Sequence, residues 1–220
     1  MKSIIFDLYG TLIDLWTNEN RNNFWQRLAI KTRKYHKYDY KELRKKYLNL
    51  CEEYSKKFEE IELLDVFNDL YGKDNAKEVA IIFRKLSTKY IRLYKGVDKL
   101  FKYLKENNYK IYLLSNAQSC FTNYELKKLG IYDKFDKLYL SSDYSIKKPN
   151  INFISTLIKN EKLDIENTIM VGNDYICDIA PAMSLNIKTI YLETNQSRFV
   201  DNVEKIKGFN LKEIIRAIEK

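Results

Sequence analysis

Histidine, cysteine, proline and glycine are scarce in this 220-residue chain, which contains one, three, two and six of them. The single histidine, His36, lies among lysines and tyrosines, so a catalytic triad or a multi-histidine metal site has no second member. The cysteines are Cys51, Cys120 and Cys177; they are isolated and odd in number, so they indicate neither a disulfide framework nor a thiolate zinc site and are expected to be buried thiols. Any enzyme chemistry must therefore depend on carboxylates, hydroxyls and lysines.

Long apolar runs are also missing. No run approaches the roughly 20 residues that span a bilayer, and the start, MKSIIFDLYG, reaches polar residues too early for a signal peptide. Hydrophobic residues nevertheless make up 45% of the chain, which is typical of a packed globular protein. The sequence therefore predicts a soluble, cytoplasmic protein without a membrane partner, built as one core or as a core with an inserted subdomain.

The formal net charge of +9 and the 18 tyrosines raise the possibility of nucleic-acid binding. Acidic residues are interleaved with the basic ones, however, as in KELRKKYLNLCEEYSKKFEE at residues 41–60. A surface that follows a phosphate backbone would exclude those acids, whereas a solvated helix face would not. We therefore expect no nucleic-acid partner.

The period of the hydrophobic residues divides the chain into three parts. Residues 4–6 form a short apolar run that predicts a strand, and residues 19–95 have a helical period that predicts four helices with no strand among them. After Gly96, short apolar strands alternate with helices; the strands are expected at residues 110–116, 137–143, 168–173 and 188–193. This pattern predicts an α/β fold, a doubly wound parallel sheet with an all-helical insertion after its first strand.

Polar residues stand at the ends of four predicted strands, where ligands bind in such sheets. These residues are Asp7 and Thr11 after the first strand, Ser115 and Asn116 after the second, Lys148 after the third, and Asn173, Asp174 and Asp178 after the fourth. Each has a simple structural explanation on its own, such as a helix cap or a turn. Their order on successive strands favours a common site for an anion.

The motifs FDLYGTL, LLSN, KKP and VGNDYICD, in this order and with a helical insertion after the first, resemble the four motifs of the haloacid dehalogenase superfamily of hydrolases. The resemblance covers the whole chain. It implies a Rossmann-like core, here residues 1–15 and 96–220, and a mobile helical cap, here residues 16–95, that closes over the site and shapes substrate choice.

The resemblance also implies a role for each motif. Asp7 would be the nucleophile that forms an aspartyl ester or aspartyl phosphate, which water then hydrolyses. A carboxylate is ionised at neutral pH without a histidine, which agrees with the composition. Thr11, Ser115 and Asn116 would hold a small anionic substrate, and Lys148 would offset the negative charge of nucleophile and substrate.

Two positions depart from the family pattern. Most phosphatases of the family carry an aspartate as general acid and base where this chain has Tyr9, and tyrosine at that position is typical of the dehalogenase branch, which needs no metal. The fourth motif instead favours magnesium. Mg²⁺ would be held by Asp7, the backbone carbonyl of Tyr9, Asn173 and Asp174. The catalytic residues would be Asp7, Tyr9, Lys148 and Asp178.

These observations leave three functions open. A Mg²⁺-dependent phosphatase of small phosphorylated metabolites, acting through an aspartyl-phosphate intermediate, is the favoured prediction. A 2-haloacid dehalogenase that uses an aspartyl ester without a metal is the first alternative. A catalytically weak binding module is the second.

Overall fold

A parallel β-sheet forms the centre of the computed structural model, which describes residues 2–220. Within this part of the chain the sheet has six strands in the order β5-β4-β1-β6-β7-β8. The strands are β1 (Ser3–Phe6), β4 (Lys110–Ser115), β5 (Lys137–Leu140), β6 (Thr168–Gly172), β7 (Lys188–Glu193) and β8 (Ile206–Lys207). All neighbouring pairs are parallel, so the predicted α/β fold is confirmed, with β8 as an additional edge strand.

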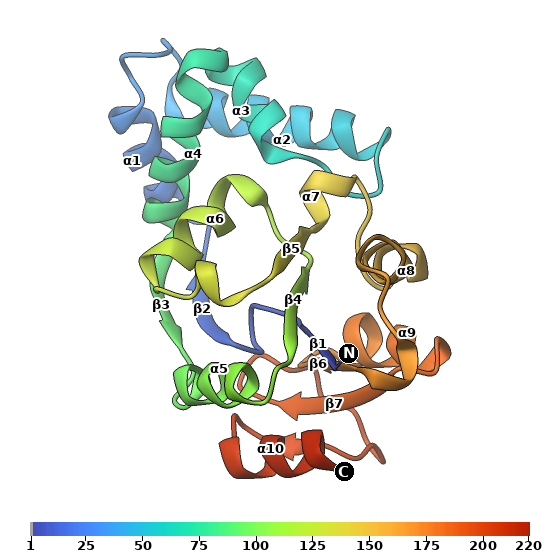
Figure 1. The fold of residues 1–220 in the computed structure, drawn as a ribbon. Helices are drawn as coiled ribbons and strands as arrows, with labels where there is room; N and C mark the ends of the chain where they lie inside the picture. Colours follow the sequence, from blue (N-terminus) through green and yellow to red (C-terminus); the bar gives the residue numbers. More distant parts are fainter. Residues whose placement is uncertain (1) are drawn as a thin grey trace.

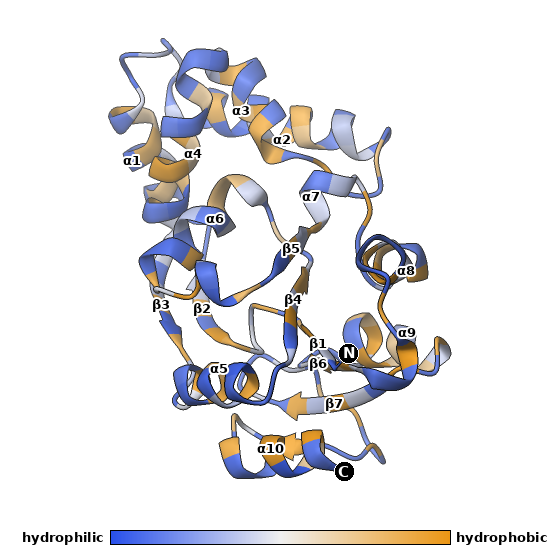
Figure 2. Cartoon of the chain, viewed as in Figure 1, coloured by the Kyte–Doolittle hydropathy of each residue, from blue (hydrophilic) through white to orange (hydrophobic). Residues whose placement is uncertain are grey.

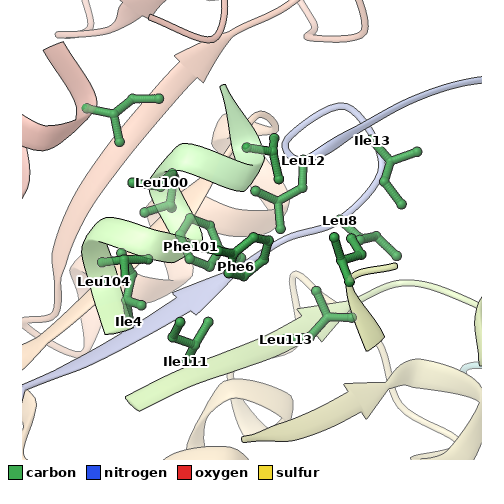
Figure 3. Close-up of a cluster of buried hydrophobic side chains, with 14 of the residues drawn as sticks. Ile4, Phe6, Leu8, Leu12, Ile13, Leu100, Phe101, Leu104, Ile111 and Leu113 are labelled. Carbon is green, nitrogen blue, oxygen red and sulfur yellow. The ribbon is translucent and has the colours of Figure 1, made fainter. Parts of the chain in front are cut away.

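Helices pack against both faces of this sheet (Figure 1). The core helices are α5 (Val97–Glu106), α6 (Ser119–Lys128), α7 (Ser141–Tyr144), α8 (Ile151–Glu161), α9 (Ala180–Ser184) and α10 (Leu211–Glu219). Ile4 and Phe6 of β1 lie in one hydrophobic cluster with α5 and α10, as the close-up in Figure 3 shows for α5, whereas Ile5 lies in another with α8. Successive side chains of a strand point to opposite faces, so a central strand buried on both sides is apolar throughout.

Four helices lie between residues 18 and 87, the segment called the helical insertion below. They are α1 (Asn22–Lys31), α2 (Tyr40–Ser55), α3 (Leu63–Tyr71) and α4 (Lys73–Ser87). Each carries hydrophobic and hydrophilic residues side by side, as expected of amphipathic helices (Figure 2). Their apolar faces form a cluster of their own around Phe67 and Phe83, which Phe121 of α6 joins. The insertion therefore packs on the core through α6.

The expectation of a purely helical segment up to residue 95 is wrong at its end. Helix α4 stops at Ser87, and β3 (Thr88–Leu93) follows, paired antiparallel with β2 (Ile13–Thr17). The run TKYIRL is rich in β-branched and aromatic residues, and its pairing with β2 overrides the helical spacing. The two strands form the ribbon through which the chain leaves the core and returns to it.

Two local predictions also need correction. The strand expected at 137–143 ends at Leu140 because Ser141 and Ser142 begin α7, where their hydroxyls accept hydrogen bonds from the backbone N–H groups of Ala117 and Ser119, both at 2.9 Å. The helix expected after β6 begins as a wider π-type turn, Tyr175–Ile179, before α9.

The three cysteines are free and half-buried, so the expectation that they are buried thiols holds only in part. His36 packs between Tyr38 and Tyr71 of the insertion, and its ring nitrogens contact the Thr32 hydroxyl and the Tyr38 backbone. None of the helices in residues 2–220 combines the length and apolarity that a bilayer span requires.

Candidate active site

The Lys148 ammonium lies at the centre of the polar residues that the strand ends bring together. It donates to Asp7 Oδ1 at 2.8 Å, to Asp178 Oδ1 at 2.6 Å and to the Leu114 carbonyl oxygen at 2.8 Å. All three of its hydrogens are therefore used, and the side chains of Lys148 and Asp178 are 4% and 2% exposed. The sequence predicts that Asp7, Lys148 and Asp178, which belong to different motifs, lie together, and the fold brings these three side chains into contact.

The two carboxylates determine the charge state of the lysine. Burial alone would lower the pKa of Lys148, but the attraction of Asp178 and Asp7 outweighs it and holds the pKa above the usual value. Burial raises the pKa of the Asp178 carboxyl, and Lys148 opposes that rise. One ammonium thus faces two carboxylates, and their mutual attraction opposes the cost of burying these charges.

The loop of residues 7–12 after β1 orients the Asp7 carboxylate. The Thr11 hydroxyl donates to Asp7 Oδ2 at 3.0 Å, and the Ser115 hydroxyl donates to Oδ1 at 3.3 Å. Gly10 has φ +87°, and a Cβ at this position would lie 2.4 Å from the Asn173 side-chain nitrogen. Only glycine fits this turn, because any other residue would be strained and would displace Asn173.

The side-chain amide of Asn173 lies among three oxygens. With its nitrogen directed at them, its two N–H groups face Thr11 Oγ1 at 3.0 Å, the Tyr9 carbonyl oxygen at 3.1 Å and Asp7 Oδ2 at 3.3 Å. With the amide rotated, its oxygen lies 3.0 Å from Thr11 Oγ1 and takes the place of the nitrogen, so a carboxylate, a carbonyl and an amide oxygen lie next to one another. These are the hard ligands that Mg²⁺ takes, and the residues present fit this ion.

The oxygens that would hold such a cation carry little negative charge. In residues 2–220 no three His, Cys, Asp or Glu side chains come together as a metal site. Of the three oxygens described above, only that of Asp7 belongs to a carboxylate, because the oxygens of Tyr9 and Asn173 are neutral. A cation held there would therefore be bound weakly.

Asp174 has a different local role. Its Oδ1 accepts the backbone N–H groups of Ile176 at 2.9 Å and Cys177 at 3.0 Å, and its Oδ2 lies 3.6 Å from Arg198 Nε. These contacts cap the turn that begins at Tyr175. The prediction of Asp174 as a metal ligand remains untested, and the geometry favours Asn173.

Asp178 holds the same loop from the other side. Its Oδ2 accepts the N–H groups of Asn173 at 3.1 Å and Asp174 at 3.0 Å. A Cβ on Gly172 would lie 2.4 Å from this oxygen, so a side chain there would collide with the carboxylate. Asp178 thus links Lys148 to the backbone that carries Asn173.

The Asn116 side chain is hydrogen-bonded to the backbone of Lys148. Its Oδ1 accepts from the Lys148 N–H and its Nδ2 donates to the Lys148 carbonyl oxygen, both at 2.8 Å. The side chain therefore positions Lys148. Substrate binding by Asn116 stays a prediction.

The Tyr9 side chain is directed toward α6. Its hydroxyl donates to Glu125 Oε2 at 2.5 Å and lies 3.0 Å from Thr122 Oγ1. Arg84 of α4 pairs with Glu125 at 2.6 Å, and its guanidinium carbon lies 5.6 Å from the centre of the Tyr9 ring. Burial, with the Glu125 charge, raises the pKa of Tyr9, so the phenol stays neutral. Sequence reasoning missed Arg84, Glu125 and Thr122, which belong to no motif.

Comparison with known proteins gives a family and several relatives. A family model described as haloacid dehalogenase-like hydrolase matches residues 4–192. A glyceraldehyde 3-phosphate phosphatase of Pyrococcus abyssi is 24% identical over 197 residues, which cover 88% of this chain and 82% of that protein. Another, of Methanocaldococcus jannaschii, is 26% identical over 129 residues, 57% of each protein. A phosphoglycolate phosphatase of Nitrosococcus oceani is 27% identical over 133 residues, 60% of this chain and 58% of that one. The chain thus spans little more than half of the last two relatives.

Solved structures share the fold. A 2-haloacid dehalogenase from Pseudomonas syringae pv. Tomato DC3000 has a TM-score of 0.69 at 18% identity and covers 100% of this chain and 98% of its own. A HAD phosphatase from Thermococcus onnurineus has a TM-score of 0.63 at 17% identity, with 98% and 97% covered. At these identities the likeness concerns the fold alone. The names of these structures include both a dehalogenase and a phosphatase.

Proposed function

Because this chain belongs to the haloacid dehalogenase-like hydrolases, we propose that it is a Mg²⁺-dependent phosphatase of small phosphorylated metabolites. The observation that carries the proposal is the group of three oxygens from Asp7, the Tyr9 carbonyl and the Asn173 amide, next to the ammonium that contacts both Asp7 and Asp178. Curated relatives are named for the hydrolysis of glyceraldehyde 3-phosphate and phosphoglycolate, which are both small phosphate esters.

In the proposed reaction a carboxylate oxygen of Asp7 attacks phosphorus, and the bond from phosphorus to the leaving oxygen breaks. The product is an aspartyl phosphate, and water then attacks its phosphorus to release inorganic phosphate and restore Asp7. Lys148 keeps its positive charge beside Asp7 throughout, and Thr11 and Ser115 hold the carboxylate in place. When bound, Mg²⁺ supplies the positive charge that offsets nucleophile and phosphate.

The helical insertion is proposed to be the cap, within residues 16–95, over a core of residues 1–15 and 96–220. Contacts across the two parts support this assignment. Gln118, two residues after Asn116, donates to the Ile61 carbonyl oxygen at 2.8 Å and accepts from the Leu63 N–H at 2.7 Å. Asp7 is 7% exposed, and the β2–β3 ribbon would be the hinge.

Leaving-group dependence tests the phosphatase proposal. The Tyr9 hydroxyl is bonded to Glu125, so the departing oxygen receives no proton from an acid at this position. General acid catalysis contributes roughly 10²- to 10⁴-fold, and we therefore expect aryl and acyl phosphates to turn over at least about 10²-fold faster than alkyl phosphates with Mg²⁺. Steady-state kcat/KM over such a series is the measurement. Equal rates across the series would contradict the unassisted leaving group, and no turnover of any ester would contradict the phosphatase.

Substitution of Asn173 tests the metal ligands. Asn173→Asp adds a second negative charge beside Asp7 Oδ2, and we expect Mg²⁺ affinity to rise on the order of tenfold, because ligand charge sets affinity at such sites. Titration of the melting temperature with Mg²⁺ measures this affinity. Asp174→Asn is the matched control, since asparagine keeps the cap and affinity should stay within about twofold. The opposite pattern would make Asp174 the ligand.

A dehalogenase remains the second candidate function, because tyrosine at position 9 of the first motif is typical of the dehalogenase branch of the family. Chloride release from 2-chloropropionate that EDTA does not affect would establish it. A catalytically weak binding module would be supported if neither Mg²⁺ nor beryllium fluoride changed the melting temperature.

A further inference from the structure

A buried series of polar contacts connects the helical insertion to the loop that follows β1. Arg84 of α4 contacts Glu125 of α6 through two nitrogens, with Nε 2.6 Å from Oε1 and Nη2 3.3 Å from Oε2. The same Glu125 Oε2 accepts the Tyr9 hydroxyl. The Arg84 and Glu125 side chains are 12% and 4% exposed.

This pair requires the insertion to lie against the core. Arg84 and Glu125 are 41 residues apart and belong to different parts of the fold. The guanidinium also packs on the core residue Phe121, 5.2 Å from its ring centre. Two-point contacts between arginine and carboxylate are strong and geometrically specific, and a buried carboxylate that loses its partner is destabilised. The contact is therefore available only while α4 lies against α6.

At its other end the series reaches the proposed metal site. The Tyr9 backbone carbonyl lies 3.1 Å from the Asn173 amide and belongs to the residue whose ring Glu125 and Arg84 hold. The loop turns tightly here, with Leu12 N donating to Leu8 O at 2.8 Å. A second anchor holds it, because the Thr194 hydroxyl donates to the Gly10 carbonyl oxygen at 2.7 Å. The hold on the Tyr9 ring is thus one of several contacts that fix this loop, and it is the one among them that depends on the insertion.

We propose that Arg84 and Glu125 are positioning residues that hold the Tyr9 carbonyl toward Asn173 when the insertion is docked, and so couple docking to Mg²⁺ binding. This inference rests on the proposed function. Coupling between two binding equilibria is reciprocal, so bound Mg²⁺ also favours the docked insertion.

Three single variants test the coupling. Glu125→Gln removes the charge that pairs with Arg84, Arg84→Gln removes the partner on the insertion, and Tyr9→Phe removes only the hydroxyl donor. We expect each to weaken Mg²⁺ binding by about five- to tenfold, within the usual range of such couplings. Titration calorimetry with Mg²⁺ alone measures the affinity. Glu78→Gln is the matched control, because Glu78 forms an exposed ion pair with Lys34 in the same insertion, and its affinity should equal that of the wild type.

Hydrogen exchange distinguishes this role from a purely structural one. Saturating Mg²⁺ should slow exchange in α4 and β3 of the wild type, and this effect should be lost in the Glu125→Gln variant. Affinities within twofold of the wild type in all three variants, at whatever melting temperature, would overturn the inference. If the wild type bound no Mg²⁺, the proposed function would fail; faster exchange of residues 7–12 in the Arg84→Gln variant would still support the positioning role, and unchanged exchange would overturn it.

Discussion

Replacing Asp7 by asparagine is expected to reduce turnover of phosphate esters by at least about 10³-fold, as the loss of a nucleophile does in other enzymes. The amide has the shape of the carboxylate and can still accept a hydrogen bond from Lys148, but it lacks the charge with which to attack phosphorus. Lys148 keeps its contact with Asp178, so the chain should remain folded. Steady-state kinetics with an aryl phosphate and Mg²⁺ measure the effect.

The control for this substitution is the same change at another acid of the site. Asp174→Asn keeps the capped turn at Tyr175 and should retain activity within a few-fold of the wild type. Thermal melts of both variants show that they are folded. An Asp7→Asn enzyme with more than about a tenth of the wild-type rate would exclude Asp7 as the nucleophile.

Replacing Lys148 by methionine is expected to have the largest effect on stability. The lysine is the cation that contacts both Asp7 and Asp178, and both carboxylates are nearly buried. Removing one partner of a buried ion pair costs about 3–5 kcal/mol of unfolding free energy, because the remaining charge is uncompensated. Urea unfolding measures the loss, and phosphatase activity should disappear with it.

Two further variants make this test specific. Lys147→Met removes the neighbouring lysine, whose side chain is 45% exposed, and should change the unfolding free energy by less than about 1 kcal/mol. Adding Asp178→Asn to Lys148→Met removes one of the two unpaired charges and should restore part of the loss. The raised pKa of Asp178 means that its carboxyl takes up a proton more readily in the folded chain, so the loss should be smaller at acidic than at alkaline pH. A Lys148→Met protein as stable as the wild type at neutral pH would contradict this role.

The meeting of Asp7, Lys148 and Asp178 could be predicted from the sequence because each follows a strand of one parallel sheet. The carboxyl ends of such strands lie along one edge, so the order of strands and motifs is sufficient to place these side chains together. The glycines of the motifs agree with this geometry, since Gly10 and Gly172 leave room for Asn173 and Asp178.

Other features depend on contacts between distant residues that leave no local pattern. Thr88–Leu93 has a helical spacing and becomes a strand because β2 is available to pair with it. The pair of Arg84 and Glu125 joins two amphipathic helices whose charges look like any others in the sequence. Substrate binding by Asn116 and metal binding by Asp174 are predicted from their places at strand ends and in the motifs, whereas their contacts with Lys148 and with the turn at Tyr175 follow from the fold.

The central claim is that Asp7 attacks phosphorus. Mass spectrometry of the enzyme quenched in acid during turnover of an aryl phosphate with Mg²⁺ tests it most directly. The proposed chemistry predicts a phosphoryl group on the peptide that contains Asp7, and none on this peptide in the Asp7→Asn variant. Phosphate release with an unmodified Asp7 peptide at every time of quenching, or a phosphoryl group on another residue, would contradict it.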